Sequence, residues 1–142
     1  MKTVVKMVFA GLIILSGCGK PANEVVHNAD STKVANKALY DKTMNIHDEV
    51  MPKMDNLYKL KKALQDTLAN TPSLSAEQKK TYEAHILRID SASNAMMVWM
   101  RQFNPPADSS LSSDSYRIYM EGELEKVEKV KAAMLKALEK DK

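Results

Sequence analysis

The sequence predicts an all-α fold, an antiparallel three-helix bundle. Apolar residues recur every three or four positions through three long stretches, 33–69, 75–103 and 114–140, and this is the spacing of one face of a helix. Short polar links that contain proline separate the stretches, and short links favour antiparallel neighbours. No stretch of the 142 residues shows the alternation that indicates a strand.

Residues 1–17 precede the predicted bundle and have the pattern of a secretory leader. Lys2 and Lys6 form a basic head, an apolar stretch follows, and Leu15-Ser16-Gly17-Cys18 closes it. This ending resembles the bacterial lipoprotein signal, in which the leader is cleaved before the cysteine and the cysteine is acylated. The resemblance implies that Cys18 is the lipid attachment site.

Cys18 is the only cysteine, so no disulfide can form within the chain. Each buried methylene of an acyl chain contributes about 0.8 kcal/mol, so that several chains on one residue anchor a protein stably. Gly19 follows the cysteine, where an acidic residue would suggest retention at an inner membrane. By resemblance to Gram-negative lipoproteins, we expect a cell-envelope protein on the periplasmic face of the outer membrane.

Residues 18–33 are predicted to form the lipid anchor and a flexible tether, because they are polar and lack a repeating apolar pattern. Residues 34–142 then form one helical bundle domain. Loss of Lys2 and Lys6 with the leader lowers the 21 basic residues to 19, against 18 acidic residues. This balance argues against nucleic-acid binding.

The first helical stretch, 33–69, is interrupted by Pro52. Proline has no N–H, so the carbonyl of Asp48 loses its helical partner, and the helix must kink or restart there. The second stretch starts at Ser75, which has capping-box spacing with Gln78. Its predicted core positions share a spacing of three and four: Tyr82, Ile86, Ile89, Ser93, Met96, Met100 and Phe103.

Residues 107–113 are rich in serine and predict a flexible surface link. The third stretch follows at Asp114, and its predicted core positions are Tyr116, Met120, Leu124, Val127, Met134 and Leu138. Gly122 lies inside this helix at a cost of about 1 kcal/mol relative to alanine. Apart from Gly19, it is the only glycine after the leader, which excludes glycine-rich phosphate loops and nucleophile elbows. We expect no enzymatic activity and no catalytic residues.

Most methionines are predicted to gather in one layer. If the first two helices pair around residues 70–75, equal rise per residue places His47 level with about residue 98, and the third helix brings Met120 to the same level. Met134 alone among the methionines of the mature chain is expected elsewhere. The predicted layer comprises Met44, His47, Met51, Met54, Met96, Met97, Met100 and Met120, beside Trp99.

Two interpretations of this layer stay open. Methionine is flexible and fills the irregular gaps that a helix kink creates, so the layer can be packing alone. Alternatively, thioethers and a neutral imidazole suit Cu(I), with Trp99 as a cation–π partner. Zinc is disfavoured because there is no cysteine cluster and no close histidine pair. For His85 we expect a structural or surface role.

Two segments carry a further resemblance: 47–54, HDEVMPKM, and 96–103, MMVWMRQF. They resemble a family of small Bacteroidota lipoproteins that is labelled "viral A-type inclusion protein". The resemblance covers the leader, the three helices and both segments. It implies a helical lipoprotein, no viral role and no established activity.

The sequence therefore predicts a lipid-anchored helical envelope protein with a non-enzymatic binding or structural role and no cofactor. The expected partners are the membrane, through the N-terminal lipid, and another envelope protein; a homodimer stays open, because one wide apolar stripe could complete its core in this way. The alternative is a periplasmic lipoprotein that binds Cu(I) or another soft metal through the methionine and histidine layer.

Overall fold

A computed structural model of the chain describes residues 22–139, with side chains from Ala29 onward. The leader and Cys18 lie outside the described residues. The elements are, in chain order, α1 (Ala22–Val50), α2 (Lys53–Asn70), α3 (Ala76–Gln102), the short 3-10 helix η1 (Asp108–Ser110) and α4 (Asp114–Leu138). The described residues contain no strand, and the predicted all-α class is confirmed.

The first predicted helix is divided into α1 and α2, with a bend of 33° at Met51–Pro52. Before the bend, the N–H of Met51 donates to the carbonyl of His47 at 2.8 Å. After it, the N–H of Met54 donates to the carbonyl of Met51 at 3.1 Å. Pro52 has no N–H to bridge the two helices, so α2 restarts one residue later in a new direction.

Helix α1 begins at Ala22. The lipid anchor and flexible tether predicted for residues 18–33 stay a prediction. No glycine or proline occurs between Ala22 and Val50, and nothing in the local sequence therefore stops the helix from extending toward the N-terminus.

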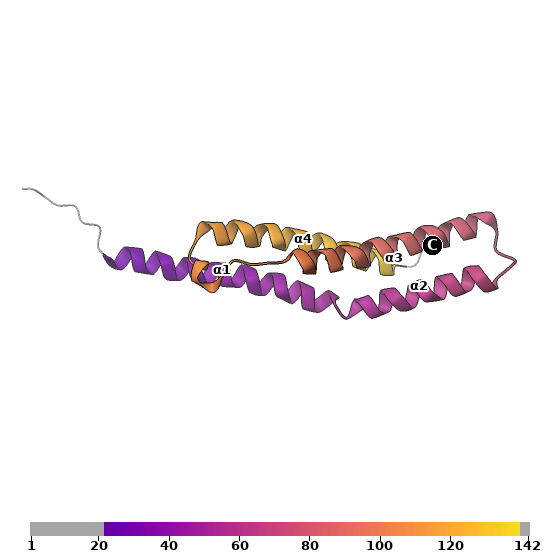
Figure 1. Ribbon diagram of the computed structural model, residues 1–142, viewed down its shortest axis with the longest axis horizontal. Helices are drawn as coiled ribbons and strands as arrows, with labels where there is room; N and C mark the ends of the chain where they lie inside the picture. Colours follow the sequence, from indigo (N-terminus) through magenta and orange to yellow (C-terminus); the bar gives the residue numbers. More distant parts are fainter. Residues whose placement is uncertain (1–21, 140–142) are drawn as a thin grey trace, which may run out of the picture.

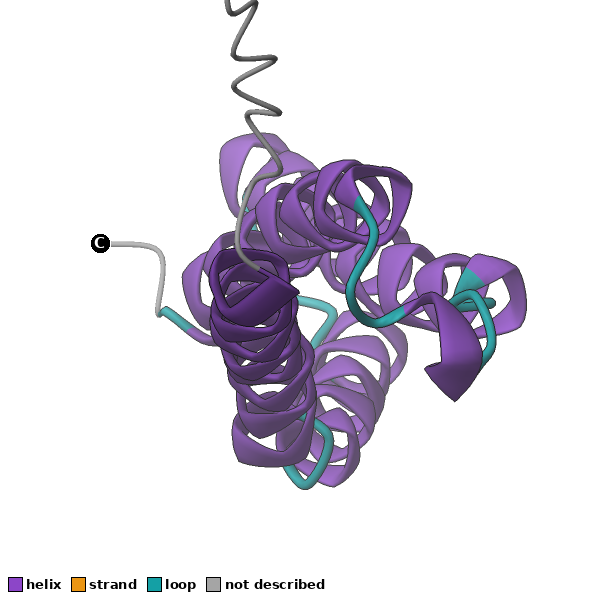
Figure 2. Ribbon diagram, turned by 90° about the vertical axis from the view of Figure 1, so that its left-hand side faces the viewer, coloured by secondary structure: helices purple, strands orange, loops and turns teal. Residues whose placement is uncertain are grey.

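The helices form a long rod (Figure 1). Helix α3 runs back along α2, and α4 turns again and lies beside α1 and α3. Helices α1 and α4 run in the same direction, and two ion pairs mark their register. Nζ of Lys42 lies 3.2 Å from a carboxylate oxygen of Glu128, and Nζ of Lys131 lies 2.6 Å from a carboxylate oxygen of Glu49. Viewed along the rod, the helices surround a common axis (Figure 2). The predicted antiparallel three-helix bundle is confirmed, with α1 and α2 together as its first helix.

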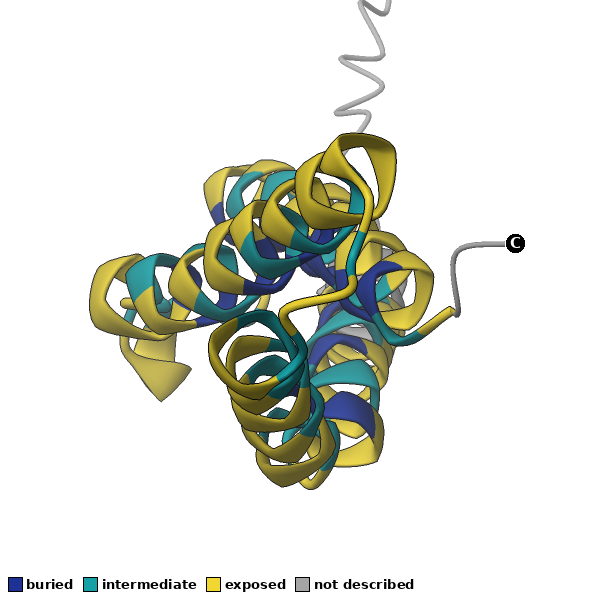
Figure 3. Ribbon diagram, turned by 90° about the vertical axis from the view of Figure 1, so that its right-hand side faces the viewer, coloured by how far each residue is buried: buried dark blue, intermediate teal, exposed yellow. Residues whose placement is uncertain are grey.

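Each helix turns its buried positions to this axis and its exposed positions to solvent (Figure 3). In α4 the buried positions follow alternating steps of four and three: Tyr116, Met120, Glu123, Val127, Val130, Met134 and Ala137. In α3 the same steps give His85, Ile89, Ala92, Met96 and Trp99. This spacing is the seam of a coiled-coil-like bundle.

The buried face of α3 differs from the predicted one. Tyr82, Ile86 and Ser93 are only partly buried and Met100 is exposed, whereas His85 is 3 % exposed. Nε2 of His85 lies 2.8 Å from the carbonyl oxygen of Ala137 on α4. This hydrogen bond satisfies a buried polar ring, so the structural role expected for His85 agrees with its position.

The helix starts follow the local sequence closely. Ser75 caps α3 with both bonds of the predicted capping box: its hydroxyl accepts from the N–H of Gln78 at 3.2 Å, and its N–H donates to the Gln78 side chain at 2.9 Å. The hydroxyl of Ser113 accepts from the N–H of Tyr116 at 3.2 Å and starts α4 at the predicted Asp114.

Helix α3 ends before the bundle does. Pro105 and Pro106 cannot continue a helix, and from Phe103 the chain runs in an extended form beside α1 to η1 (Figure 1). At this end of the rod, a thin extended segment therefore takes the place of a third helix. Within the part of the chain that the structure describes, no helix combines the length and apolar character needed to cross a membrane.

Candidate functional site

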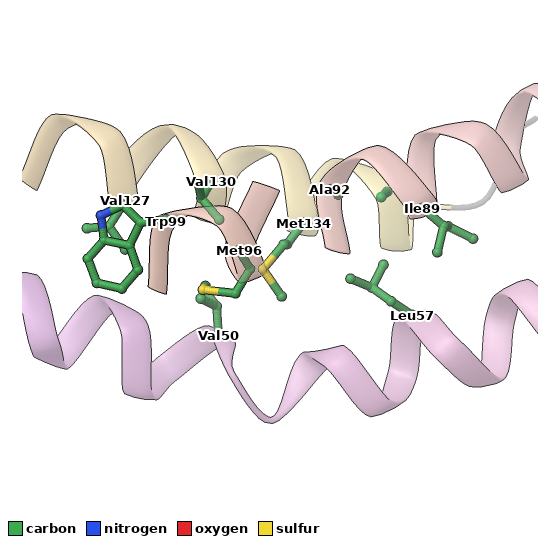
Figure 4. Packing of buried hydrophobic residues seen from close by; sticks show 10 residues of the cluster. Val50, Leu57, Ile89, Ala92, Met96, Trp99, Val127, Val130 and Met134 are labelled. Atoms are coloured by element: carbon green, nitrogen blue, oxygen red, sulfur yellow. The ribbon is translucent and has the colours of Figure 1, made fainter. Parts of the chain in front are cut away.

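The structure gathers part of the predicted methionine layer in the main apolar cluster. Met96 and Met134 are fully buried there together with Val50, and Met51 and Met54 pack against them while partly exposed. The thioethers of Met96 and Met134 come from α3 and α4 and lie close to each other above Val50, beside the bend between α1 and α2 (Figure 4). Methionines from α2, α3 and α4 and from the break itself thus gather at the helix break.

Other members of the predicted layer lie elsewhere. Met97 is 38 % exposed and Met100 is 36 % exposed, because both lie on α3 outside its buried seam. Met44 is half-buried outside the main cluster, and Met120 is fully buried but outside it as well. Met134, which was expected elsewhere, belongs to the cluster, because its flexible side chain fills space at the bend.

His47 reaches the predicted level on α3. Its ring centroid lies 5.7 Å from that of Trp99, in agreement with the expected pairing of His47 with about residue 98. Nδ1 of His47 lies 2.8 Å from a carboxylate oxygen of Asp48, and because an ionised carboxylate only accepts, Nδ1 carries the hydrogen. Trp99 is 4 % exposed and also contacts Phe103, with ring centroids 4.9 Å apart.

Nε1 of Trp99 and Oε2 of Glu123 are buried and have no hydrogen-bond partner among the residues that the structure describes. Glu123 occupies a core position of α4 at 3 % exposure, and its other carboxylate oxygen accepts from the ammonium of Lys126 at 2.7 Å. The antiparallel register set by His85 and Ala137 places Trp99 level with Glu123. Among the described residues, no group of three or more His, Cys, Asp or Glu side chains is arranged to hold a metal ion.

An open pocket lies at the end of the bundle where α3 has stopped, and its volume is about 510 Å³. We name it the proline-loop pocket. Its walls come from α1, from the link between α3 and α4, and from the first turn of α4: Lys37, Tyr40, Asp41, Pro105, Pro106, Ala107, Asp108, Leu111 and Tyr116. Volumes of this size are typical of small-molecule sites.

The link that forms one wall of the pocket is fixed to α1. The side-chain amide of Asn36 is fully buried and donates to the carbonyl oxygens of Leu111 and Ser113, at 2.6 Å and 3.1 Å. The hydroxyl of Ser113 also donates to the carbonyl of Ser110 at 2.6 Å. The segment 107–113, predicted as a flexible link, is therefore a folded wall, because Asn36 supplies its backbone with partners.

Tyr116 is the most buried residue of the pocket lining, at 2 % exposure. No described residue forms a hydrogen bond with its hydroxyl, and this hydroxyl is not one of the fully buried polar atoms that lack a partner, so part of its surface is accessible. Burial raises the pKa of Tyr116, and the negative charges of Asp108 and Asp41 and the nearby Tyr40 raise it further, while Lys37 lowers it. The hydroxyl therefore stays protonated at neutral pH and can both donate and accept a hydrogen bond.

None of the candidate site residues predicted from the sequence lies in this pocket. Pro105 and Pro106 are the local signal for it, because they stop α3 early and leave an extended segment in place of a third helix. What the sequence could not show is the contact between Asn36 and Leu111, which lie 75 positions apart. The sequence alone therefore predicts that residues 107–113 are a flexible, solvent-exposed link.

Comparison with protein-family models, with curated proteins and with solved structures finds no match to this chain.

Proposed function

We propose that this chain is a lipid-anchored binding protein of the bacterial cell envelope without catalytic activity of its own. Cys18 attaches it to the membrane, on the periplasmic face of the outer membrane, and the proline-loop pocket holds a ligand. The observation that carries the binding role is the open pocket of about 510 Å³, whose lining includes Tyr116 with a hydroxyl that no described residue binds.

The Tyr116 hydroxyl is not one of the fully buried polar atoms without a partner, so part of its surface is accessible. A few polar groups within a mostly apolar pocket are what orients a ligand. Tyr116 with a raised pKa is a poor general base, since its phenolate is disfavoured at neutral pH. These properties favour binding by hydrogen bonds over catalysis at this site.

The leader pattern and Cys18 support the lipid anchor. Because several acyl chains on one cysteine give stable attachment, the wild-type protein should stay in the membrane fraction after a wash at high salt. Cys18→Ala should release it, and mass spectrometry of the N-terminal peptide of the native protein should show an acylated Cys18. An intact leader with a free thiol would refute the anchor. The envelope-protein partner and the homodimer stay predictions.

A second candidate function is Cu(I) binding at the bend between α1 and α2. One observation favours it: Asp48 holds Nδ1 of His47 at 2.8 Å, which leaves Nε2 as the available ring nitrogen. Histidines that bind metals usually donate their other ring N–H in this way. Met51 lies one turn after His47 and packs against the cluster that contains Met96, so soft ligands are near.

Anaerobic titration with Cu(I) against a competing chelator tests this second candidate. It predicts one tightly bound ion, quenched Trp99 fluorescence, and loss of both when His47 and Met51 are replaced by alanine. Met97→Ala is the matched control, because this methionine is exposed on α3 outside the cluster. Equal copper affinity of the double variant and of the wild type would exclude the site.

A further inference from the structure

We propose that the proline-loop pocket binds an organic monocation, in which a primary ammonium or guanidinium group is carried on a short apolar stem. This inference rests on the binding role proposed above and names the class of ligand.

The polar groups of the pocket are mostly acceptors. Asp41 and Asp108 contribute carboxylates, whereas Pro105 and Pro106 have no N–H to offer. Lys37 is the cationic donor in the wall, and both carboxylate oxygens of Asp41 already bind its ammonium, at 2.8 Å and 2.6 Å. A ligand that completes these walls must therefore donate hydrogen bonds.

The charges of the pocket leave one negative charge without compensation. Lys37 neutralises Asp41, and Asp108 forms no ion pair with any residue that the structure describes. The Lys37–Asp41 pair is itself exposed, with side-chain exposures of 64 % and 50 %, so a competing cation can displace Lys37 at small cost. A single positive charge on the ligand balances Asp108.

The remaining walls are apolar and aromatic. Tyr40, Leu111 and the two prolines surround a space of about 510 Å³, and an alkyl stem gains by leaving water there. The rings of Tyr40 and Tyr116 can also attract a cation through their faces. The protonated hydroxyl of Tyr116, which no described residue binds, can accept a hydrogen bond from the ligand N–H.

Isothermal titration calorimetry of the full chain in a neutral detergent tests the ligand class. The probes are n-pentylammonium and n-butylguanidinium as cations, 1-pentanol as the neutral analogue, and pentanoate as the anion. We expect saturable binding of the cations, with at least about tenfold weaker binding of the alcohol, the difference that one charge-assisted hydrogen bond accounts for. Nα-acetyl-lysine methylamide shows whether the pocket also accepts a lysine side chain of another protein.

Three variants locate the binding. Asp108→Asn keeps the shape of an exposed side chain and should weaken binding of n-pentylammonium about tenfold. Tyr116→Phe keeps the buried ring and should weaken it several-fold, since the Tyr116 hydroxyl alone is lost. Asp55→Asn is the matched control, because Asp55 pairs with Lys59 on α2, away from the pocket.

Binding of 1-pentanol as tight as that of n-pentylammonium would overturn the proposal, as would equal affinities of Asp108→Asn and the wild type or the absence of binding at millimolar concentration. These outcomes are separate from those of the anchor test. If the wild type is membrane-bound but does not bind the cationic probes, the ligand class alone is refuted. A protein that binds the cations but carries an unmodified Cys18 refutes the envelope address alone.

Discussion

The side-chain amide of Asn36 donates a hydrogen bond of 2.6 Å to the carbonyl oxygen of Leu111, 75 positions further along the chain. A second bond of 3.1 Å runs from the same amide nitrogen to the carbonyl of Ser113. One buried side chain of α1 thus fixes both the wall of the proline-loop pocket and the entry to α4. The position of Asn36 among the apolar core positions is explained by these two partners.

Asn36→Ala should lower the free energy of unfolding by about 1–3 kcal/mol, because two buried carbonyl groups lose their donor. Chemical denaturation measures the loss, and hydrogen exchange should show faster exchange of the amides in residues 107–113. Asn45→Ala is the control, since Asn45 is exposed on the same helix. Unchanged exchange in the link would mean that other contacts hold it.

Tyr116 should make the stability of the protein depend on alkaline pH. Burial, followed by Asp108, Tyr40 and Asp41, raises the pKa of Tyr116 above its ordinary value of about 10. Since the folded state holds this proton more tightly than the unfolded state, the contribution is complete below about pH 10 and is lost as the pH rises through the folded pKa.

Denaturation of the wild type and of Tyr116→Phe between pH 8 and 12 checks this dependence. The wild type should lose stability more steeply above about pH 10 than the variant, whereas the two curves should run parallel below it. Tyr58→Phe is the control, because Tyr58 is 67 % exposed on α2. Parallel curves over the whole range would contradict the raised pKa of Tyr116.

The helices were predictable because their signals are local. The capping box of Ser75 and Gln78, the break at Pro52 and the start at Asp114 each depend on residues within one turn. The buried face was less predictable, since Asn36, Thr43, His85 and Glu123 occupy buried positions that the apolar pattern does not count. Each of the four has a hydrogen-bond partner, and the partners of Asn36 and His85 lie on distant segments that no periodicity reveals.

The predicted methionine layer was partly right for the same reason. Equal rise per residue gave the correct height of His47 beside Trp99, whereas it could not say which way each side chain points. Met97 and Met100 have the right height, yet they lie outside the seam that runs through Met96 and Trp99. The buried seam of α3 includes the polar His85. A prediction based on apolar residues alone therefore chose a neighbouring face of the helix.

Gly122→Ala should stabilise the protein. Gly122 lies inside α4 with ordinary helical geometry, and a Cβ built there meets no atom within 4 Å. Alanine restricts the unfolded chain and favours the helix, so we expect a gain of about 0.5–1 kcal/mol in the free energy of unfolding. Urea denaturation measures it, and Ala132→Gly on the exposed side of α4 should give a loss of similar size. A destabilised Gly122→Ala protein would indicate that another molecule approaches the backbone at this point.

Glu123→Met should leave the protein as stable as the wild type or stabilise it by about 1 kcal/mol, because it removes a buried carboxylate from an apolar seam. Only one carboxylate oxygen of Glu123 has a partner, the ammonium of Lys126 at 2.7 Å, and the other is buried without one. A methionine of similar length fills the same space and needs no hydrogen bond. The denaturation midpoint measures the effect, and Glu125→Met serves as control, since Glu125 is 68 % exposed and should tolerate the change without a shift. A clear loss of stability in Glu123→Met would contradict this prediction and would indicate that Oε2 accepts from Nε1–H of Trp99 in solution, because the antiparallel register places these two orphaned atoms at the same level of the bundle.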